Sequence, residues 1–113
     1  MRKPGFRWGQ TLSVEAFARV DWFAAPPGGT RSRFTVVIWA PKPHAGGDFA
    51  CSVQIGSSTV HPIVGVDSLQ SLVLALVYVR HELEQHVLAG WAFYRSSTDL
   101  EAFDPSSYFV SRA

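Results

Sequence analysis

The sequence predicts an α+β fold, a four-stranded antiparallel meander with one long helix packed on one face and room for a short fifth strand after the helix. Three observations lead to this class. Residues 12–22 alternate between apolar and polar side chains with a period of two, which is typical of a half-buried strand. Turns rich in glycine and proline separate further short alternating segments. A capped apolar segment at residues 68–88 has the length of a helix that can cover a small sheet.

The four strands are expected at residues 12–22, 34–39, 49–55 and 59–64. Each pair is separated by a turn: Pro-Pro-Gly-Gly after the first strand, Gly-Gly-Asp before the third and Gly-Ser-Ser after it. Pro62 lacks the backbone N–H that a central strand uses, so the fourth strand is expected at an edge or at a bulge. Consecutive strands joined by short turns usually pair with each other, which favours a meander. Residues 91–95 can add the short fifth strand.

The helix has recognisable signals at both ends. Asp67 can accept a hydrogen bond from a free N–H of the first turn, and Gln70 can reach back to the N–H of Asp67 to complete a capping box. Gly90 suits the left-handed residue that commonly follows a helix, and Trp91 can fold back on the last turn.

The faces of this helix predict what it covers. Because successive residues are rotated by about 100°, seven apolar side chains form one stripe that is expected in the core. They are Leu69, Leu72, Val73, Leu76, Val79, Leu83 and Val87. Leu74, Val77 and Tyr78 point elsewhere, so the first half of the helix is apolar on more than one side. Arg80 falls within the stripe and is expected to extend past the sheet edge.

Length and composition predict a single domain over residues 1–113, with an N-terminal arm at 1–10 and a tail at 96–113 that are partly ordered. The tail is expected to lay its aromatic side chains on the domain. One cysteine cannot form an internal disulfide, and no segment has the length and apolarity of a membrane span. The cytoplasm is therefore the expected compartment, and no membrane contact is expected.

Charge is unevenly distributed along the chain, although the net charge is only +1. Residues 1–42 hold seven Arg and Lys against two Asp and Glu, and residues 43–113 hold three against seven. Nucleic acid is not an expected partner, because the cations are few and the acidic second half would repel phosphate.

The residues that could carry chemistry do not form a catalytic set. His81 and His86 are five apart and leave different faces of the helix, whereas the zinc-protease motif needs a spacing of four. Cys51 has the inward parity of its strand and is expected to be buried and inert. We therefore expect no metal, no cofactor and no enzymatic activity.

The strands and the entry Gly-Val-Asp-Ser-Leu-Gln at residues 65–70 resemble a widespread group of uncharacterised small bacterial α+β proteins. The resemblance covers mainly residues 50–91, and its motif marks the start of a helix. It implies a single-domain cytosolic protein, and some members of such groups resemble immunity proteins that neutralise secreted toxins. It carries no catalytic residues.

The surfaces that the fold leaves unexplained are apolar, which favours a protein-binding module that occludes its partner. The expected contact residues are Phe17, Arg19, Val37 and Trp39 on the outward parity of the first two strands, and Leu74, Val77 and Tyr78 on the helix. Two alternatives stay open. One is a small-molecule enzyme that assembles a histidine and a carboxylate from distant segments, which a cleft holding His61 or His81 beside an acidic residue would favour. The other is a homodimer joined through the outer sheet face.

Overall fold

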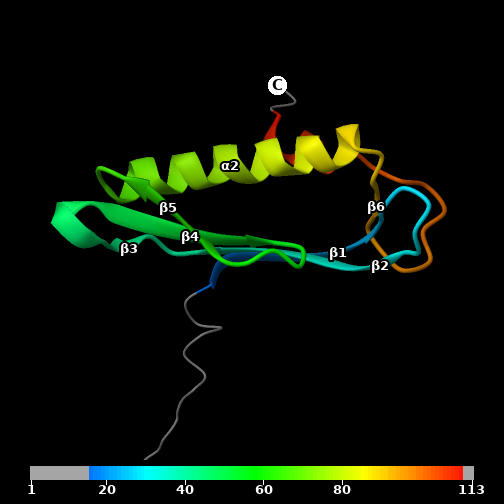
Figure 1. Cartoon of the computed structure of the whole chain (residues 1–113), viewed down its shortest axis with the longest axis horizontal. Coiled ribbons are helices and arrows are strands. Elements are labelled where there is room, and N and C mark those ends of the chain that lie inside the picture. The colour runs from blue at the N-terminus through cyan, green and yellow to red at the C-terminus, as the bar shows by residue number, and fades with distance from the viewer. Residues whose placement is uncertain (1–15, 111–113) are drawn as a thin grey trace, which may run out of the picture.

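The computed structural model describes residues 16–110, which form an antiparallel sheet with one long helix lying along one face (Figure 1). The predicted α+β class is confirmed. The sheet has six strands rather than four. They are β1 (Ala16–Ala25), β2 (Ser32–Trp39), β3 (Lys42–Pro43), β4 (Phe49–Ile55), β5 (His61–Gly65) and β6 (Ala92–Tyr94). The long helix is α2 (Ser68–Leu88), and two short 3-10 helices are η2 (Ala45–Gly47) and η3 (Pro105–Phe109).

Neighbouring strands in the sheet follow the order β5, β4, β2, β1, β6, and every pair is antiparallel. The two-residue β3 pairs with the start of β4 on the edge that β2 also uses. The strand expected after the helix is present as β6, which pairs with the end of β1. The edge position predicted from Pro62 is also confirmed, since β5 pairs only with β4 among the described residues. The predicted start of the first strand and the N-terminal arm at 1–10 lie outside the described residues.

The core lies between α2 and the inner face of the sheet. Large aromatic side chains fill its far end, where the rings of Phe34 and Phe93 meet edge to face at 5.0 Å. Cys51 is fully buried, as predicted, and its thiol donates a hydrogen bond to the carbonyl oxygen of Trp39 over 3.1 Å. Burial raises the pKa of this thiol, and Cys51 packs as a small apolar core residue.

The ends of α2 follow the capping signals. The Asp67 carboxylate accepts a hydrogen bond from the N–H of Gln70 at 2.8 Å. The Gln70 side-chain oxygen accepts a hydrogen bond from the N–H of Val66 rather than from that of Asp67, the donor that a capping box predicts. At the other end Gly90 has a φ of 99°, and the N–H of Trp91 donates to the carbonyl of His86 over 3.0 Å. This is a Schellman motif, which only a left-handed residue can close.

The buried face of α2 differs from the predicted stripe. Ser71, Ala75, Val79 and Leu83 are the buried residues of the helix, while Leu69 and Val73 of the expected stripe are 69% and 47% exposed. Arg80 is exposed and pairs with Glu84 at 3.2 Å. The physical reason lies in β5, where an added Cβ on Gly65 would lie 2.5 Å from the Ser71 nitrogen. The helix backbone rests directly on this glycine, so only small side chains fit at the contact; Leu69 and Val73 turn outward, while Leu72 still packs against the core.

The chain after β6 returns to the domain. Phe103 forms an isolated bridge with Phe93 beyond β6, and the ring of Tyr108 in η3 packs edge-on against Trp22 at 5.3 Å. The turn between β1 and β2 holds this segment through Arg31, whose guanidinium lies 3.4 Å from the Tyr94 ring centroid. The Arg31 guanidinium also donates hydrogen bonds to the carbonyl oxygens of Ser96, Ser97 and Asp99. The expected packing of tail aromatics on the domain is therefore present up to Val110.

Candidate protein-interaction surface

The expected contact residues lie on two opposite sides of the molecule. Phe17, Arg19 and Trp39 belong to β1 and β2, and the register places Arg19 beside Val37 on the sheet face turned away from α2. Leu74 and Val77 lie on the helix, at 39% and 59% exposure. The sheet separates the two sets, so no single flat partner surface contacts both.

The outer sheet face is more polar than the sequence predicts. Val37 is only 7% exposed, which corrects its expected role as a contact residue. It lies between Arg19 on one neighbouring strand and Gln54 on the other, and these longer side chains flank it on both sides. Arg19 also pairs with Asp21 at 3.4 Å, and Thr35 donates a hydrogen bond to the same carboxylate over 2.6 Å.

Those two contacts have an electrostatic consequence. The hydrogen bond from Thr35, and then the one from Arg19, lower the pKa of the Asp21 carboxyl below its usual value. The middle of this face therefore carries a fixed charge pair at neutral pH, while Phe17 remains an isolated exposed aromatic beside it.

Tyr78 is half-buried beside the core. Its ring packs against the core cluster and lies 5.9 Å from the ring of His61 on β5. Burial and then the nearby Glu82 charge raise the pKa of its hydroxyl. Leu74 lies on the same side of α2, one turn earlier, so of the three predicted helix residues Val77 projects furthest into solvent.

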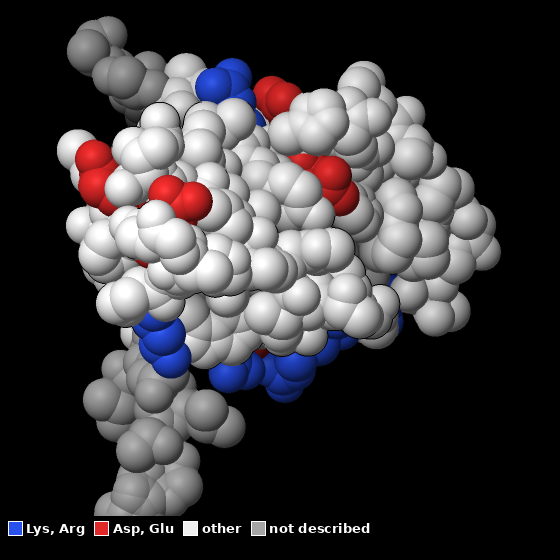
Figure 2. Space-filling model, turned by 60° about the vertical axis from the view of Figure 1, so that its left-hand side comes forward, with Lys and Arg blue, Asp and Glu red and all other residues white. Residues whose placement is uncertain are grey.

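The outward side of α2 carries an apolar band that begins just before the helix. Its members are large side chains with at least a third of their surface exposed, and the helix carries no charged residue from Leu69 to Val79. Space-filling representation shows how few charges reach the face at this end of the molecule (Figure 2). The band consists of Val66, Leu69, Val73, Leu76 and Val77.

The tail and the later part of this band, from Val73 to Val77, form a groove. Residues of η3 and the one after it rise beside the helix and enclose a hollow of about 490 Å³. Arg80 lies at its end, held by its ion pair with Glu84. The lining residues are Val73, Leu76, Val77, Arg80, Tyr108, Phe109 and Val110.

A second apolar hollow, of about 180 Å³, lies on the other side of η3. Its walls are the inner residues of β1 and β2 and the buried face of α2, including Val20, Val36 and Val79. Tyr108 and Phe109 line both hollows and form the ridge between them. Sequence reasoning did not assign these two residues to the site, although the aromatic character of the tail was a signal for them.

A third hollow, of about 360 Å³, brings titratable groups together. His61 of β5 and Glu82 and His86 of α2 line it, along with the ring of Trp91. His86 Nδ1 lies 2.7 Å from the carbonyl oxygen of Glu82, and since a carbonyl only accepts, Nδ1 carries a proton. Ser58 in the same hollow is occupied, because its hydroxyl donates to the Thr59 carbonyl and accepts from an N–H of its own turn.

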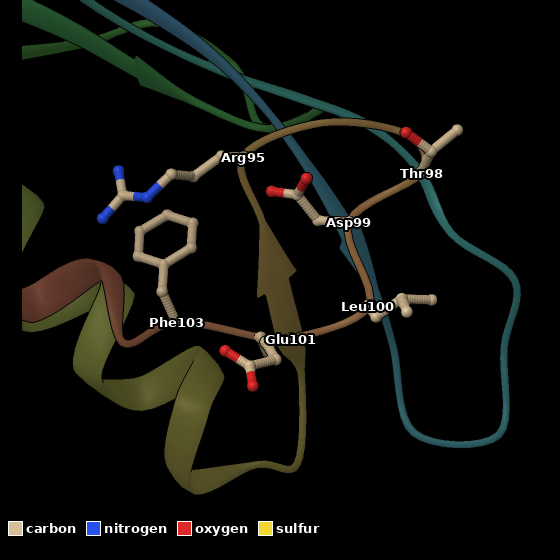
Figure 3. Close-up of a pocket in the computed structure, with 7 residues that line it drawn as sticks. Arg95, Thr98, Asp99, Leu100, Glu101 and Phe103 are labelled. Atoms are coloured by element: carbon tan, nitrogen blue, oxygen red, sulfur yellow. The ribbon is translucent and has the colours of Figure 1, made fainter.

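The segment after β6 encloses a wide depression of about 630 Å³, shown in Figure 3. Two of its polar side chains, Arg95 and Asp99, are held by neighbours in the same segment. Arg95 extends across the Phe103 ring at 4.2 Å and donates to the Tyr108 hydroxyl over 2.6 Å. The Asp99 carboxylate accepts from the Ser96 hydroxyl. The Arg95 and Asp99 side chains therefore hold the loop together, and Glu101 lines the same depression.

Within residues 16–110, no three His, Cys, Asp or Glu side chains are grouped so that they could hold a metal ion. In the same range no helix combines the length and apolarity that a membrane crossing requires.

Comparison with known proteins gives a family but no function. No curated protein matches this chain, and no solved structure matches it. One family model matches residues 23–90, a segment that runs from the end of β1 through α2 and includes the helix entry and the apolar band. Since this is more than half of the chain, the protein belongs to the family described as a domain of unknown function, DUF6968.

Proposed function

We propose that this chain is a small bacterial, cytoplasmic protein-binding module of the kind that immunity proteins represent, and that it neutralises a toxin by covering part of its surface. The observation that carries the proposal is the groove between α2 and η3, in which Val73, Leu76 and Val77 face solvent opposite Tyr108 and Val110. Exposed apolar surface of this kind is costly in an isolated protein and typical of interfaces.

The chemistry of the groove indicates the partner. Apolar and aromatic side chains dominate its lining, and the cation at its end is already paired with Glu84. A partner loop or helix with an apolar anchor would fit such a surface, whereas phosphate or an anionic membrane would need several free cations. This supports a protein partner and argues against nucleic acid.

Growth rescue tests the proposal. The product of the gene encoded beside this chain is expressed in a bacterial host, with and without the chain, and colony formation is counted. We expect rescue by the wild type, loss of rescue with Val77→Lys and retained rescue with Leu88→Lys. Both changes place lysine at an exposed position of α2, but Leu88 lies outside the groove. Equal rescue by both variants would exclude the groove as the interface, and a harmless neighbouring product would exclude the toxin.

A small-molecule enzyme is the second candidate, and one observation favours it. His61 and Glu82 line the same 360 Å³ hollow, which is the arrangement that such an enzyme requires. Proton transfer between a histidine and a carboxylate is the chemistry that these two residues could supply in this hollow.

Deuterium exchange tests this candidate. Small carbonyl compounds are incubated with the protein in deuterated buffer, and loss of the α-proton signal is followed by NMR. The enzyme predicts exchange above the buffer rate that falls in both His61→Gln and Glu82→Gln. Exchange at the buffer rate for every compound would argue against proton-transfer chemistry.

A further inference from the structure

The outer edge of β1 is only partly used. Strand β6 pairs with its last three residues, Phe23 to Ala25. At the other end the pairing of β1 with β2 shifts register between Ala16 and Ala18, so Phe17 is a bulged residue where regular pairing ends. Between the bulge and β6, residues 18–22 have no strand on their outer edge within residues 16–110. An exposed row of N–H and C=O groups of this kind is a template for another strand.

This open segment has two chemically different faces. Ala18, Val20 and Trp22 pair with Ile38, Val36 and Phe34 of the core, so they belong to the inner face of the sheet. All three also border the 180 Å³ apolar hollow. Arg19 and Asp21 lie on the outer face, where they form an ion pair. A strand added here must therefore be apolar on one side and charged on the other.

We infer that the strand that pairs with residues 18–22 is the same segment of a second copy of this chain, related by a two-fold axis at Val20. The axis follows from the length of the open segment. In a symmetric antiparallel pair a residue lies opposite its own copy at the axis, and Val20 is the centre of residues 18–22. Only this register uses the whole segment without involving the bulge or β6. The inference goes beyond the proposed function, since it uses a different element from the groove.

The register brings complementary groups together on both faces. On the outer face, Arg19 of each copy lies opposite Asp21 of the other, so two more opposite-charge pairs join the two ion pairs that exist within the copies. On the inner face Val20 meets its own copy, and Ala18 lies opposite Trp22, a small residue beside a large one. Opposite charges directly across a strand pair stabilise a sheet, and like charges destabilise it.

Neighbouring registers fail by the same criteria. An axis at Arg19 would set the two guanidinium groups opposite each other and would use Phe17 of the bulge. An axis at Asp21 would set two carboxylates opposite each other and would need the edge of Phe23, which β6 occupies. The alternation along β1 thus favours the register centred on Val20. In this register the 180 Å³ hollow of one copy lies next to the same hollow of the other copy.

Charge exchange tests this inference through the molar mass in solution. The wild type, Arg19→Asp, Asp21→Arg and the double variant are measured by size-exclusion chromatography with light scattering, at concentrations up to about 1 mM to include weak association. We expect the wild type and the double variant to have twice the chain mass of 12.5 kDa, and each single variant to be monomeric. Mixing the two single variants should restore the double mass, because the carboxylate introduced at position 19 of one copy then faces the guanidinium introduced at position 21 of the other.

Several results would overturn the inference. A monomeric wild type across the concentration range would do so, and so would single variants that remain dimeric or a mixture that stays monomeric. Circular dichroism and thermal unfolding of each variant separate loss of pairing from loss of fold. Val77→Lys should remain dimeric, so failure of the groove and failure of the β1 edge give different results. A wild type that stays monomeric but binds an added foreign peptide would assign the edge to another strand.

Discussion

The two halves of α2 contact the sheet in opposite ways. In the first half the buried residues are Ser71 and Ala75, and large apolar side chains such as Leu69 and Val73 face solvent. In the second half Val79 and Leu83 are buried, and the exposed side carries the Arg80–Glu84 pair. The second half is an ordinary amphipathic helix. The first half is largely inverted, although Leu72 still packs against the core.

This difference shows which side chains of α2 hold the helix to the sheet and which do not. The contact of the first half with β5 depends on small residues and would persist if every outward side chain were polar. The apolar band at Leu69, Val73 and Val77 therefore has no role in holding the helix to the sheet, whereas Leu83 does. Exposed apolar surface that is not needed to hold the helix to the sheet is a reason to assign it to a partner.

The largest expected difference between the two halves of α2 comes from shortening one leucine in each half to alanine. Leu83→Ala should lower the free energy of unfolding by about 2–5 kcal/mol, because it leaves a cavity in a filled core. Leu69→Ala should change it by less than about 0.5 kcal/mol, as is usual for an exposed position. Urea unfolding followed by tryptophan fluorescence measures both. Equal losses would mean that the two halves are equally buried.

The close contact at the helix start is tested by adding one methyl group. Gly65→Ala places a Cβ 2.5 Å from the Ser71 nitrogen, so the helix must move away from β5, at a cost of about 1–3 kcal/mol for such overpacking. Ser71→Ala is the matched control, since it removes only the hydroxyl that donates to the Ser68 carbonyl and should cost about 1 kcal/mol or less. If Gly65→Ala is as stable as the wild type, the inversion has another cause.

The cap at the same end gives a smaller effect. Asp67→Ala removes the acceptor of the Gln70 N–H and should destabilise the protein by about 1 kcal/mol. Asp67→Asn keeps an acceptor of equal capping strength, so thermal unfolding should separate the two variants. A loss of similar size in both would indicate that charge at the helix start matters more than the hydrogen bond.

Local patterns predicted most of the fold. Period-two alternation located the main strands, and the signals at Asp67 and Gly90 gave the bounds of α2. The two-residue β3 was missed because it contains Pro43 and is too short to show a period. The buried face of α2 was predicted in part: Leu72, Val79, Leu83 and Val87 lie in or against the core, whereas Leu69, Val73 and Leu76 are exposed. A helical projection uses only the angle and the hydrophobicity of each side chain. It cannot show that Gly65 brings the backbone close enough to exclude a leucine.

The candidate site was harder to predict because it depends on contacts between distant segments. The outward parity of Val37 was correct, but its neighbours Arg19 and Gln54 are known only from the strand order. The groove needs η3 beside α2, and a five-residue 3-10 helix has no periodicity to detect. Val77 and Leu74 were predicted to be exposed because they fall outside any single core-facing stripe, and of the two only Val77 lines the groove.

The smallest expected effect on stability is also the sharpest test of the inversion. The double variant Leu69→Lys, Val73→Lys adds two charges to the apolar band, and both positions are exposed. Lysine has an equal or better helix propensity than the residues it replaces, so the free energy of unfolding should change by less than about 0.5 kcal/mol. Urea unfolding measures this, and growth rescue with the same variant should be lost.

The same two-lysine change at Ala75 and Val79 should unfold the protein, because both side chains are buried and a lysine there has no partner. A loss well above 1 kcal/mol for the exposed pair would mean that the band packs against this chain, since packing alone makes such surface charge costly.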